Sequence, residues 1–233
     1  NYPAILIVYA TSGLGASDLW TDEWGLDVVI GGSQKAISAP AGIAFISVSD
    51  KAWKLNEKSK LPRFYFDLAV ARSYYSRKLP QSPWTPGISI IVATNKALDI
   101  LFEEGLEKVF KRHRILAMAV QKAAEKIGLE LLVKDKNKRG FSVTSIMVPD
   151  GIDAGELTKT MRVKYGVTIA GGQGKLSGKI IRIGNLGYFG MFDIIIAASA
   201  LEIVLEELGY KFEVGSGVAE AEKVFIENNY LND

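Results

Sequence analysis

The chain has 233 residues, of which 48% are hydrophobic and 23% charged, which is the composition of a globular protein with a sizeable core. Its formal net charge of +2 is too small to attract a nucleic acid or an acidic membrane surface, so we expect neither as a partner. The sequence contains no cysteine, which excludes disulfides, thiolate metal sites and cysteine nucleophiles. This composition fits a reducing compartment, and we expect a cytoplasmic protein.

Short apolar runs alternate with turns and helical patterns through the first hundred residues. Runs of this kind predict strands buried on both faces, which are typical of a mostly parallel sheet in an α/β domain. In such sheets ligands gather beyond the carboxyl ends of the strands. In chain order the predicted elements are strands at 5–8, 27–30 and 43–48, a helix at 49–56, a partly helical aromatic segment at 63–77, a proline-rich loop at 79–87 and a helix at 88–104.

The sequence starts without a methionine, and residues 2–9 (YPAILIVY) already read as a buried strand. We therefore expect the chain to be part of a longer polypeptide. A sheet without its earlier strands would expose its edges and apolar surface, so we also expect association with the remaining part or with a partner.

After Gly105 the pattern changes to strands mixed with helices, which predicts a smaller α+β domain. We divide the chain into residues 1–105, the end of a larger domain with its connecting helix, and residues 106–233, the small domain. The predicted elements of the small domain are helices at 106–127, 153–165, 191–208 and 218–229 and strands at 141–148, 167–170 and 180–183.

The only histidine is His113, which stands between Arg112 and Arg114 in a predicted helix. A single histidine excludes metal sites that need several, and we expect no metal. We interpret His113 as a surface residue rather than a catalytic one.

The main candidate for chemistry is the segment Gly31-Gly32-Ser33-Gln34-Lys35, which directly follows the second predicted strand. Glycines let the backbone approach a ligand closely. A lysine at this edge of a sheet can form a Schiff base with an aldehyde cofactor and act as a general base once freed. On spacing alone, however, an exposed surface lysine is the more common interpretation.

Two other glycine-rich segments differ from phosphate-binding loops. Gly13-Leu14-Gly15 lacks the third glycine of a dinucleotide fingerprint, and the run from Gly171 to Lys175 lacks the spacing of a P-loop. We interpret both segments as turns.

The wider context of Lys35 resembles a known family. The run from Trp24 to Ala36 (WGLDVVIGGSQKA) is similar to the pyridoxal phosphate–lysine segment of class V aminotransferases, in particular the alanine–glyoxylate and serine–pyruvate aminotransferases. Further similar motifs follow in the family's order: FYFD at 64–67, Thr-Pro at 85–86 and GKIIRIGNLG at 178–187. The resemblance covers essentially the whole chain. It implies part of the large cofactor-binding domain of a fold-type I aminotransferase, followed by the small α+β domain.

The resemblance also implies roles for single residues. Lys35 would hold pyridoxal phosphate and move a proton between the substrate α-carbon and the cofactor, and Gln34 would form a hydrogen bond near the cofactor. Arg182 would bind the substrate α-carboxylate, which a guanidinium can grip with two parallel hydrogen bonds. Without the resemblance, a structural salt bridge is the better interpretation of Arg182. Thr85 would reach the cofactor phosphate of a neighbouring subunit, which implies a homodimer.

Two positions depart from the family pattern. Many members have a tyrosine that contacts the cofactor phosphate three residues before Thr85, where this chain has Ser82, and the second departure concerns the ring nitrogen of the cofactor. Where the family has an aspartate that pairs with the cofactor's ring nitrogen, this chain has Tyr9. A phenol is neutral near pH 7, so it can form a hydrogen bond to that nitrogen but cannot stabilise its positive charge. We therefore expect the cofactor to activate substrates more slowly in this chain.

The leading hypothesis is transamination between a small amino acid (alanine or serine) and a 2-oxo acid (glyoxylate or pyruvate). We expect it to be weak or absent in this chain alone, because of Tyr9 and because the first part of the large domain is not in this sequence. Two alternatives remain open. One is a degenerate or split aminotransferase portion that acts as a structural or interaction module. The other is a pyridoxal phosphate lyase of the same fold.

Overall fold

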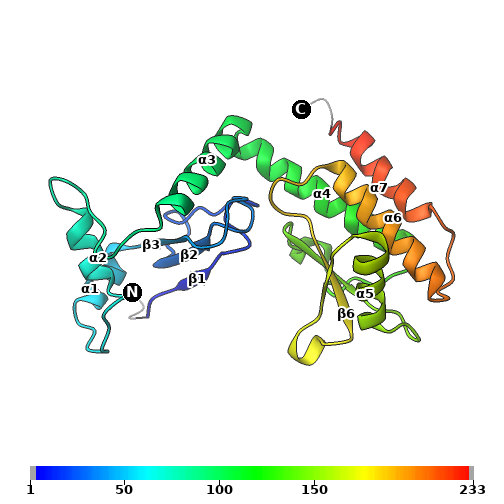
Figure 1. Ribbon diagram of the computed structural model, residues 1–233, viewed down its shortest axis with the longest axis horizontal. Coiled ribbons are helices and arrows are strands. Elements are labelled where there is room, and N and C mark those ends of the chain that lie inside the picture. The colour runs from blue at the N-terminus through cyan, green and yellow to red at the C-terminus, as the bar shows by residue number, and fades with distance from the viewer. Residues whose placement is uncertain (1–3, 231–233) are drawn as a thin grey trace. The chain divides into compact units, whose positions relative to one another are not determined.

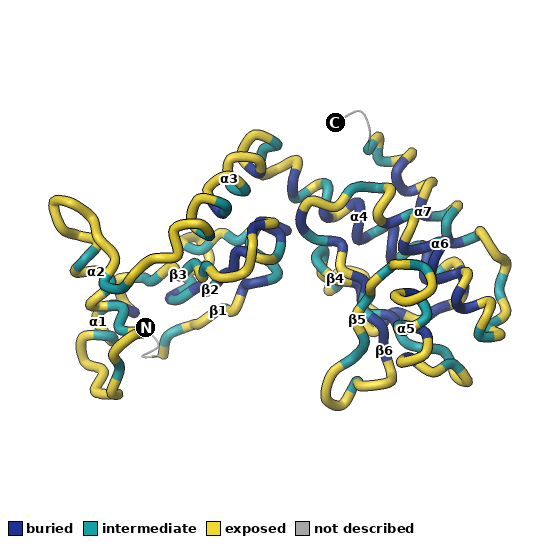
Figure 2. Tube along the Cα trace, viewed as in Figure 1, coloured by how far each residue is buried: buried dark blue, intermediate teal, exposed yellow. Residues whose placement is uncertain are grey.

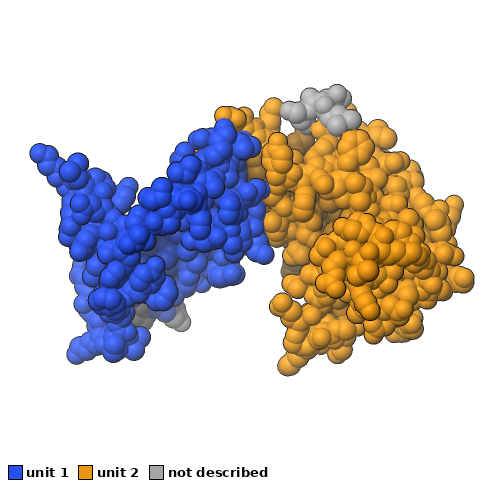
Figure 3. Space-filling view, viewed as in Figure 1, with its two compact units in different colours: residues 1–14, 18–101 blue, residues 15–17, 102–233 orange. Residues whose placement is uncertain are grey.

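The computed structural model describes residues 4–230, in which the chain forms two compact units, coloured separately in Figure 3. The first unit extends to residue 14 and continues over 18–101, and the second contains 15–17 and the residues from 102 onward. Residues 2 and 3 of the first predicted strand lie outside the described residues. The domain boundary near Gly105 stays a prediction.

A three-stranded sheet with the order β1-β2-β3 is the centre of the first unit (Figure 1). Strand β1 (Ile7–Tyr9) is parallel to β2 (Val28–Gly32), and β2 is antiparallel to β3 (Ala44–Val48). The expected mostly parallel arrangement is therefore wrong for β3. The physical reason is the connection: a parallel neighbour needs a long crossover, whereas a compact turn without a helix joins β2 to β3.

Asp27 fixes the amino end of β2. Its carboxylate accepts hydrogen bonds from the backbone N–H of Leu6 and the hydroxyl of Ser49, both at 2.9 Å, and pairs with Lys51 at 3.1 Å. The backbone hydrogen bond from Leu6 is the largest influence that lowers the pKa of Asp27, and Ser49 and Lys51 act in the same direction. The buried carboxylate thus links the strands to the first helix, a role that the sequence analysis did not assign.

The helices of the first unit begin at the polar residues that cap them. Ser49 accepts from the backbone N–H of Ala52 at the start of α1, and Asp67 accepts from those of Ala69 and Val70 at the start of α2. The helices are α1 (Asp50–Asn56), α2 (Leu68–Tyr75) and α3 (Ile88–Glu104), whose last residues belong to the second unit.

The second unit has an antiparallel sheet with the order β4-β6-β5, covered by helices on one face. The paired residues Thr144 and Ile183, and likewise Ile146 and Ile181, face the helices and are buried. The burial colours of Figure 2 follow this pattern along α4 and β6. The elements are α4 (Leu106–Lys126), β4 (Val143–Met147), α5 (Ala154–Tyr165), β5 (Ala170–Gly171), β6 (Ile180–Gly184), α6 (Met191–Glu207) and α7 (Ser216–Glu227), with short 3₁₀ helices at Lys136–Lys138 and Gly174–Leu176.

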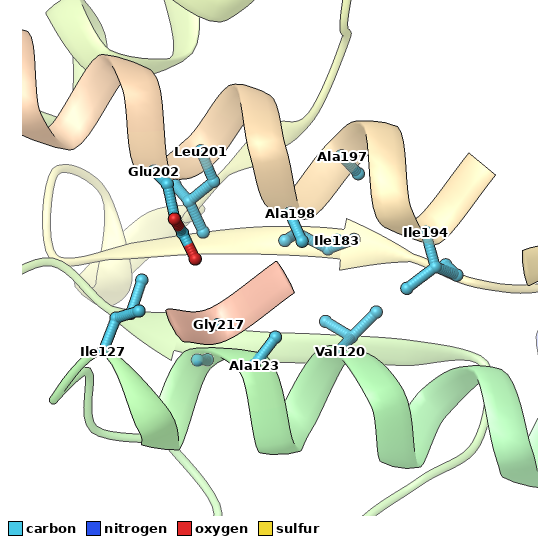
Figure 4. A pocket seen from close by; sticks show the side chains of 11 residues that line it. Val120, Ala123, Ile127, Ile183, Ile194, Ala197, Ala198, Leu201, Glu202 and Gly217 are labelled. Carbon is cyan, nitrogen blue, oxygen red and sulfur yellow. The ribbon is translucent and has the colours of Figure 1, made fainter. Parts of the chain in front are cut away.

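A buried carboxylate stands at the start of α7. Glu202, on α6, accepts hydrogen bonds from the backbone N–H groups of Gly215 and Val218, the latter at 2.9 Å. Figure 4 shows its carboxylate turned towards Gly217, where a Cβ atom would lie 2.6 Å from Glu202 Oε1. A negative charge is favourable at a helix N-terminus, and the missing side chain of Gly217 makes room for it.

His113 is fully buried, so its expected surface position is wrong. Its Nδ1 lies 2.8 Å from the carbonyl oxygen of Val109, and its Nε2 accepts a hydrogen bond of 2.9 Å from the backbone N–H of Gly187. The next residue on α4, Arg112, donates to the carbonyl of Gly187 at 2.7 Å and forms a double ion pair with Glu104. The amphipathic pattern of α4 places His113 on its inner face, which the flanking arginines had obscured.

Burial lowers the pKa of His113 below its ordinary value; Arg112 acts in the same direction, while the Val109 carbonyl and Glu104 oppose it. The folded state therefore binds fewer protons at this residue than the unfolded state, and stability falls as the pH drops below about 6.5, the unfolded pKa. We expect the His113→Gln variant to lose less thermal stability than the wild type between pH 7 and pH 5. Equal losses in the two proteins, measured by circular dichroism, would contradict this expectation.

Among the described residues, no helix has the length and apolar character needed to cross a membrane.

Candidate active site

Lys35 lies in a tight turn that follows β2. The hydroxyl of Ser33, a fully buried residue, donates to the carbonyl of Pro40 at 2.7 Å and accepts from the backbone N–H of Ile43 at 3.3 Å. The backbone N–H of Ser38 bonds the Lys35 carbonyl at 2.9 Å, with Ser38 itself in a left-handed conformation at φ 63°. Ser33 therefore fixes the loop that carries the lysine, which is a role that the sequence analysis missed.

The two glycines before this turn are required by close packing. A Cβ atom on Gly31 would overlap the side chain of Leu14, and one on Gly32 would lie 3.0 Å from Thr11 Cγ2 and 2.8 Å from Gln34 Oε1. The loop after β1 thus closes onto the end of β2, and Gln34 reaches back over Gly32. Lys35 is half-buried, and no hydrogen bond or ion pair engages its amine within residues 4–230.

Tyr9 is the last residue of β1 and pairs in register with Ile30 of β2. It therefore lies at the same carboxyl end of the sheet as the glycine turn, where the sequence analysis placed it. Its side chain is 76% exposed, with no hydrogen bond to its hydroxyl in the described part of the chain.

Thr85 is exposed on the loop before α3. Its neighbour Trp84 donates from Nε1 to the carbonyl of Tyr65 at 3.2 Å and packs against the rings of Phe64 and Tyr65, with centroids 4.7 and 5.5 Å away. This aromatic group fixes the start of the Thr-Pro segment, and the described residues give no contact between Thr85 and Lys35.

Arg182 belongs to the second unit and lies in the middle of β6. Its direct neighbours across the sheet are the small residues Ser145 on β4 and Ala170 on β5. Its Nε donates to the carbonyl oxygen of Gly171 at 2.9 Å. No carboxylate of the described residues pairs with Arg182, so the alternative of a structural salt bridge is wrong for this part of the chain. The described residues give the two terminal nitrogens of Arg182 no hydrogen bond.

Solved structures with this fold include several aminotransferases and, at lower similarity, a cysteine desulfurase. The structure of pyridoxamine–pyruvate aminotransferase from Mesorhizobium loti superposes with a TM-score of 0.90 at 30% identity, over 97% of this chain and 58% of that one. The fold and the lysine turn together define part of a fold-type I aminotransferase, as the sequence predicted.

The family is equally clear from the sequence comparison: the chain belongs to the class V aminotransferases, whose model matches residues 1–182. Pyridoxal phosphate is the cofactor of this family. The small subunit of a soluble hydrogenase from Synechococcus sp. is 42% identical over 95% of the chain. Serine–glyoxylate aminotransferase of Arabidopsis thaliana is 36% identical, also over 95% of the chain. The chain spans 57% and 55% of these two relatives, which is little more than half of their length.

The residues of the first unit fit this cofactor in most respects. Within residues 4–230 the amine of Lys35 has no protein partner, and Gln34 lies beside it with its amide packed over Gly32. Tyr9, which the resemblance predicts to lie beside the ring nitrogen, has a phenol where the family has a carboxylate.

Proposed function

We propose that the protein containing this chain is a pyridoxal phosphate-dependent aminotransferase that moves an amino group between a small amino acid and a 2-oxo acid. The observation that carries the proposal is the half-buried amine of Lys35, which no side chain within residues 4–230 pairs, in a turn fixed by Ser33 at the carboxyl end of β2. The name of the relative from Arabidopsis thaliana supports serine as donor and glyoxylate as acceptor. Alanine and pyruvate are the other members of the same substrate class.

Each residue has a distinct task in this proposal. The cofactor, when bound, withdraws electrons from the substrate α-carbon and so makes its proton removable. Lys35 holds the cofactor and then moves the proton at that carbon through its Nζ atom. Gln34 orients the cofactor, and Arg182 binds the substrate carboxylate. Thr85 donates a hydrogen bond to the phosphate of the cofactor that a neighbouring subunit holds.

A homodimer is the assembly that we propose. The aromatic surface around Trp84 supports it, because Phe64 is 77% exposed and Phe66 is 83% exposed in the single chain. Exposed apolar groups of this size mark interaction surfaces. The lack of cysteine in the sequence supports a reducing compartment, and we place the enzyme in the cytoplasm.

The proposed role of Arg182 gives a direct kinetic test. Lysine keeps the positive charge but cannot grip a carboxylate with two parallel hydrogen bonds. We expect Arg182→Lys to raise KM for both the amino acid and the 2-oxo acid about tenfold or more, since charge-assisted hydrogen bonds contribute about 1.5–3 kcal/mol. A matched control is Arg162→Lys, because Arg162 is an exposed residue of α5.

Steady-state assays of serine or alanine with glyoxylate or pyruvate measure both the proposed activity and this effect. Amino transfer with these substrates supports the proposed function. Two results would contradict parts of the proposal: no transfer with any of the four substrates, or KM values unchanged in Arg182→Lys.

Tyr9 is expected to slow the reaction rather than change its type. A neutral phenol oxygen that accepts a hydrogen bond from the protonated ring nitrogen stabilises its positive charge less than a carboxylate does. This departure is the one observation that favours the alternative of a degenerate aminotransferase portion. Among the described residues, nothing pairs with the amine of Lys35 or with the terminal nitrogens of Arg182, and this opposes that alternative.

A further inference from the structure

The turn after β5 folds tightly onto the strand that carries Arg182. The backbone N–H of Gly172 donates to the carbonyl of Ile180 at 3.0 Å. The chain then makes a short 3₁₀ helix over Gly174–Leu176, and the backbone N–H of Lys179 returns to the carbonyl of Leu176 at 3.1 Å. The Leu176 carbonyl is thereby pressed against the α-carbon of Gly172.

Only glycine fits at position 172. A Cβ atom there would lie 2.6 Å from the carbonyl carbon of Leu176, closer still to its oxygen, and 2.9 Å from Ile180 Cγ1. The obstacles are mainly backbone atoms, which cannot turn aside as a side chain can. The conflict is purely steric, because Gly172 is not among the glycines with positive φ.

This turn also determines where Arg182 points. The Nε of Arg182 donates to the carbonyl of Gly171, the residue directly before Gly172. A guanidinium held at Nε has its planar group fixed, with its two terminal nitrogens directed away from that bond. Ser145 and Ala170, the neighbours of Arg182 across the sheet, have short side chains that do not reach over the guanidinium's bond to Gly171. The direction of the guanidinium thus depends on the position of one backbone carbonyl.

We propose that Gly172 is a positioning residue of the substrate-carboxylate site: it allows the tight turn that places the Gly171 carbonyl, which in turn orients the guanidinium of Arg182. This inference rests on the proposed role of Arg182 and names what sets its geometry. A displacement of about 1 Å in such a group lowers catalysis by as much as 100-fold. Since the lost interaction is with the carboxylate, which is bound both before and during the reaction, the effect falls on KM.

The test is the Gly172→Ala variant, with Gly140→Ala as matched control. Gly140 lies in the same unit, has no positive φ, and a Cβ atom there meets nothing within 4 Å. We expect Gly172→Ala to raise KM for amino acid and 2-oxo acid about ten- to 100-fold with kcat nearly unchanged. Gly140→Ala keeps wild-type values.

A second readout is independent of activity. The protein is labelled with ¹⁵N-arginine, and the Nε–H signal of Arg182 is assigned because it disappears in Arg182→Lys. This proton is expected to exchange slowly with water while it bonds the Gly171 carbonyl. Gly172→Ala is expected to speed this exchange about tenfold or more, corresponding to about 1.4 kcal/mol or more for the lost bond. Wild-type exchange together with wild-type KM values overturns the inference.

Gly178→Ala covers the case in which Gly172→Ala does not fold. Gly178 lies in the same turn with φ 73° and open space around it, so alanine there adds only backbone strain. We expect smaller changes of KM and exchange in the same direction, and no change in either overturns the inference. If Arg182→Lys leaves KM unchanged, the proposed carboxylate role fails, whereas the exchange measurement still decides whether Gly172 positions Arg182.

Discussion

Replacing Lys35 with alanine is expected to reduce amino transfer by about 10³-fold or more. The substitution removes both the amine that holds the cofactor and the general base that moves the substrate proton, and a general base alone contributes about 10²- to 10⁴-fold. The surrounding turn should survive, because its hydrogen bonds involve the Ser33 hydroxyl and backbone groups, not the lysine side chain. The expected loss is therefore chemical and not a consequence of unfolding.

A suitable control for this experiment is Lys54→Ala. Lys54 is an exposed residue in the last turn of α1, in the same unit as Lys35. We expect it to retain wild-type turnover and thermal stability. Turnover by Lys35→Ala at the rate of the wild type would show that another residue carries the chemistry.

The second large effect is expected at Tyr9, where an aspartate should increase turnover. A carboxylate stabilises a protonated ring nitrogen through a charge-assisted hydrogen bond that contributes about 1.5–3 kcal/mol, whereas the neutral phenol contributes less. If half or more of that difference acts on the transition state, kcat rises about three- to 100-fold in Tyr9→Asp. The exposed side chain at the end of β1 allows the change without disturbing a core.

Tyr9→Phe tests whether such an increase comes from the added carboxylate or only from the loss of the phenol hydroxyl. It removes the hydroxyl but adds no charge, so turnover should stay at or below the wild-type value. Steady-state kinetics of the three proteins with the same substrates make the comparison. An aspartate variant no faster than wild type would mean that Tyr9 does not stand beside the ring nitrogen.

Much of the fold could be predicted because local signals agree with it. Ser49, Asp67 and Asp153 accept hydrogen bonds from the first turns of the helices that follow them, and Gly166 ends α5 in a left-handed conformation. Helix α3 has the predicted bounds, and the predicted strands coincide with the observed ones to within a few residues. These features depend on short-range chemistry that a single sequence displays.

The remaining features depend on contacts between distant residues. His113 lies on the buried face of α4, and its ring accepts a hydrogen bond from Gly187, 74 positions away, which no local pattern shows. Strand β3 is antiparallel because the turn around Ser33 is short, which the apolar run of β3 does not reveal. The carbonyl of Gly171 is a backbone group and has no sequence signal, although the glycine at position 172 marks its turn.

In the candidate site, too, some residues could be identified from the sequence and others only from the structure. The sequence identified Lys35, Gln34, Tyr9, Thr85 and Arg182 through their resemblance to a family to which the chain indeed belongs. Their roles stay predictions. Ser33 and Gly172, which hold two of these residues in place, became visible only with the structure.

One measurement tests the central claim most directly. The protein is incubated with pyridoxal phosphate, reduced with borohydride and digested. The masses of its peptides are then measured by mass spectrometry. The account predicts a reduced cofactor adduct on the peptide that contains Lys35, and its loss in Lys35→Ala. An adduct confined to other lysines, or none at all, would contradict the assignment of Lys35 as the residue that holds the cofactor.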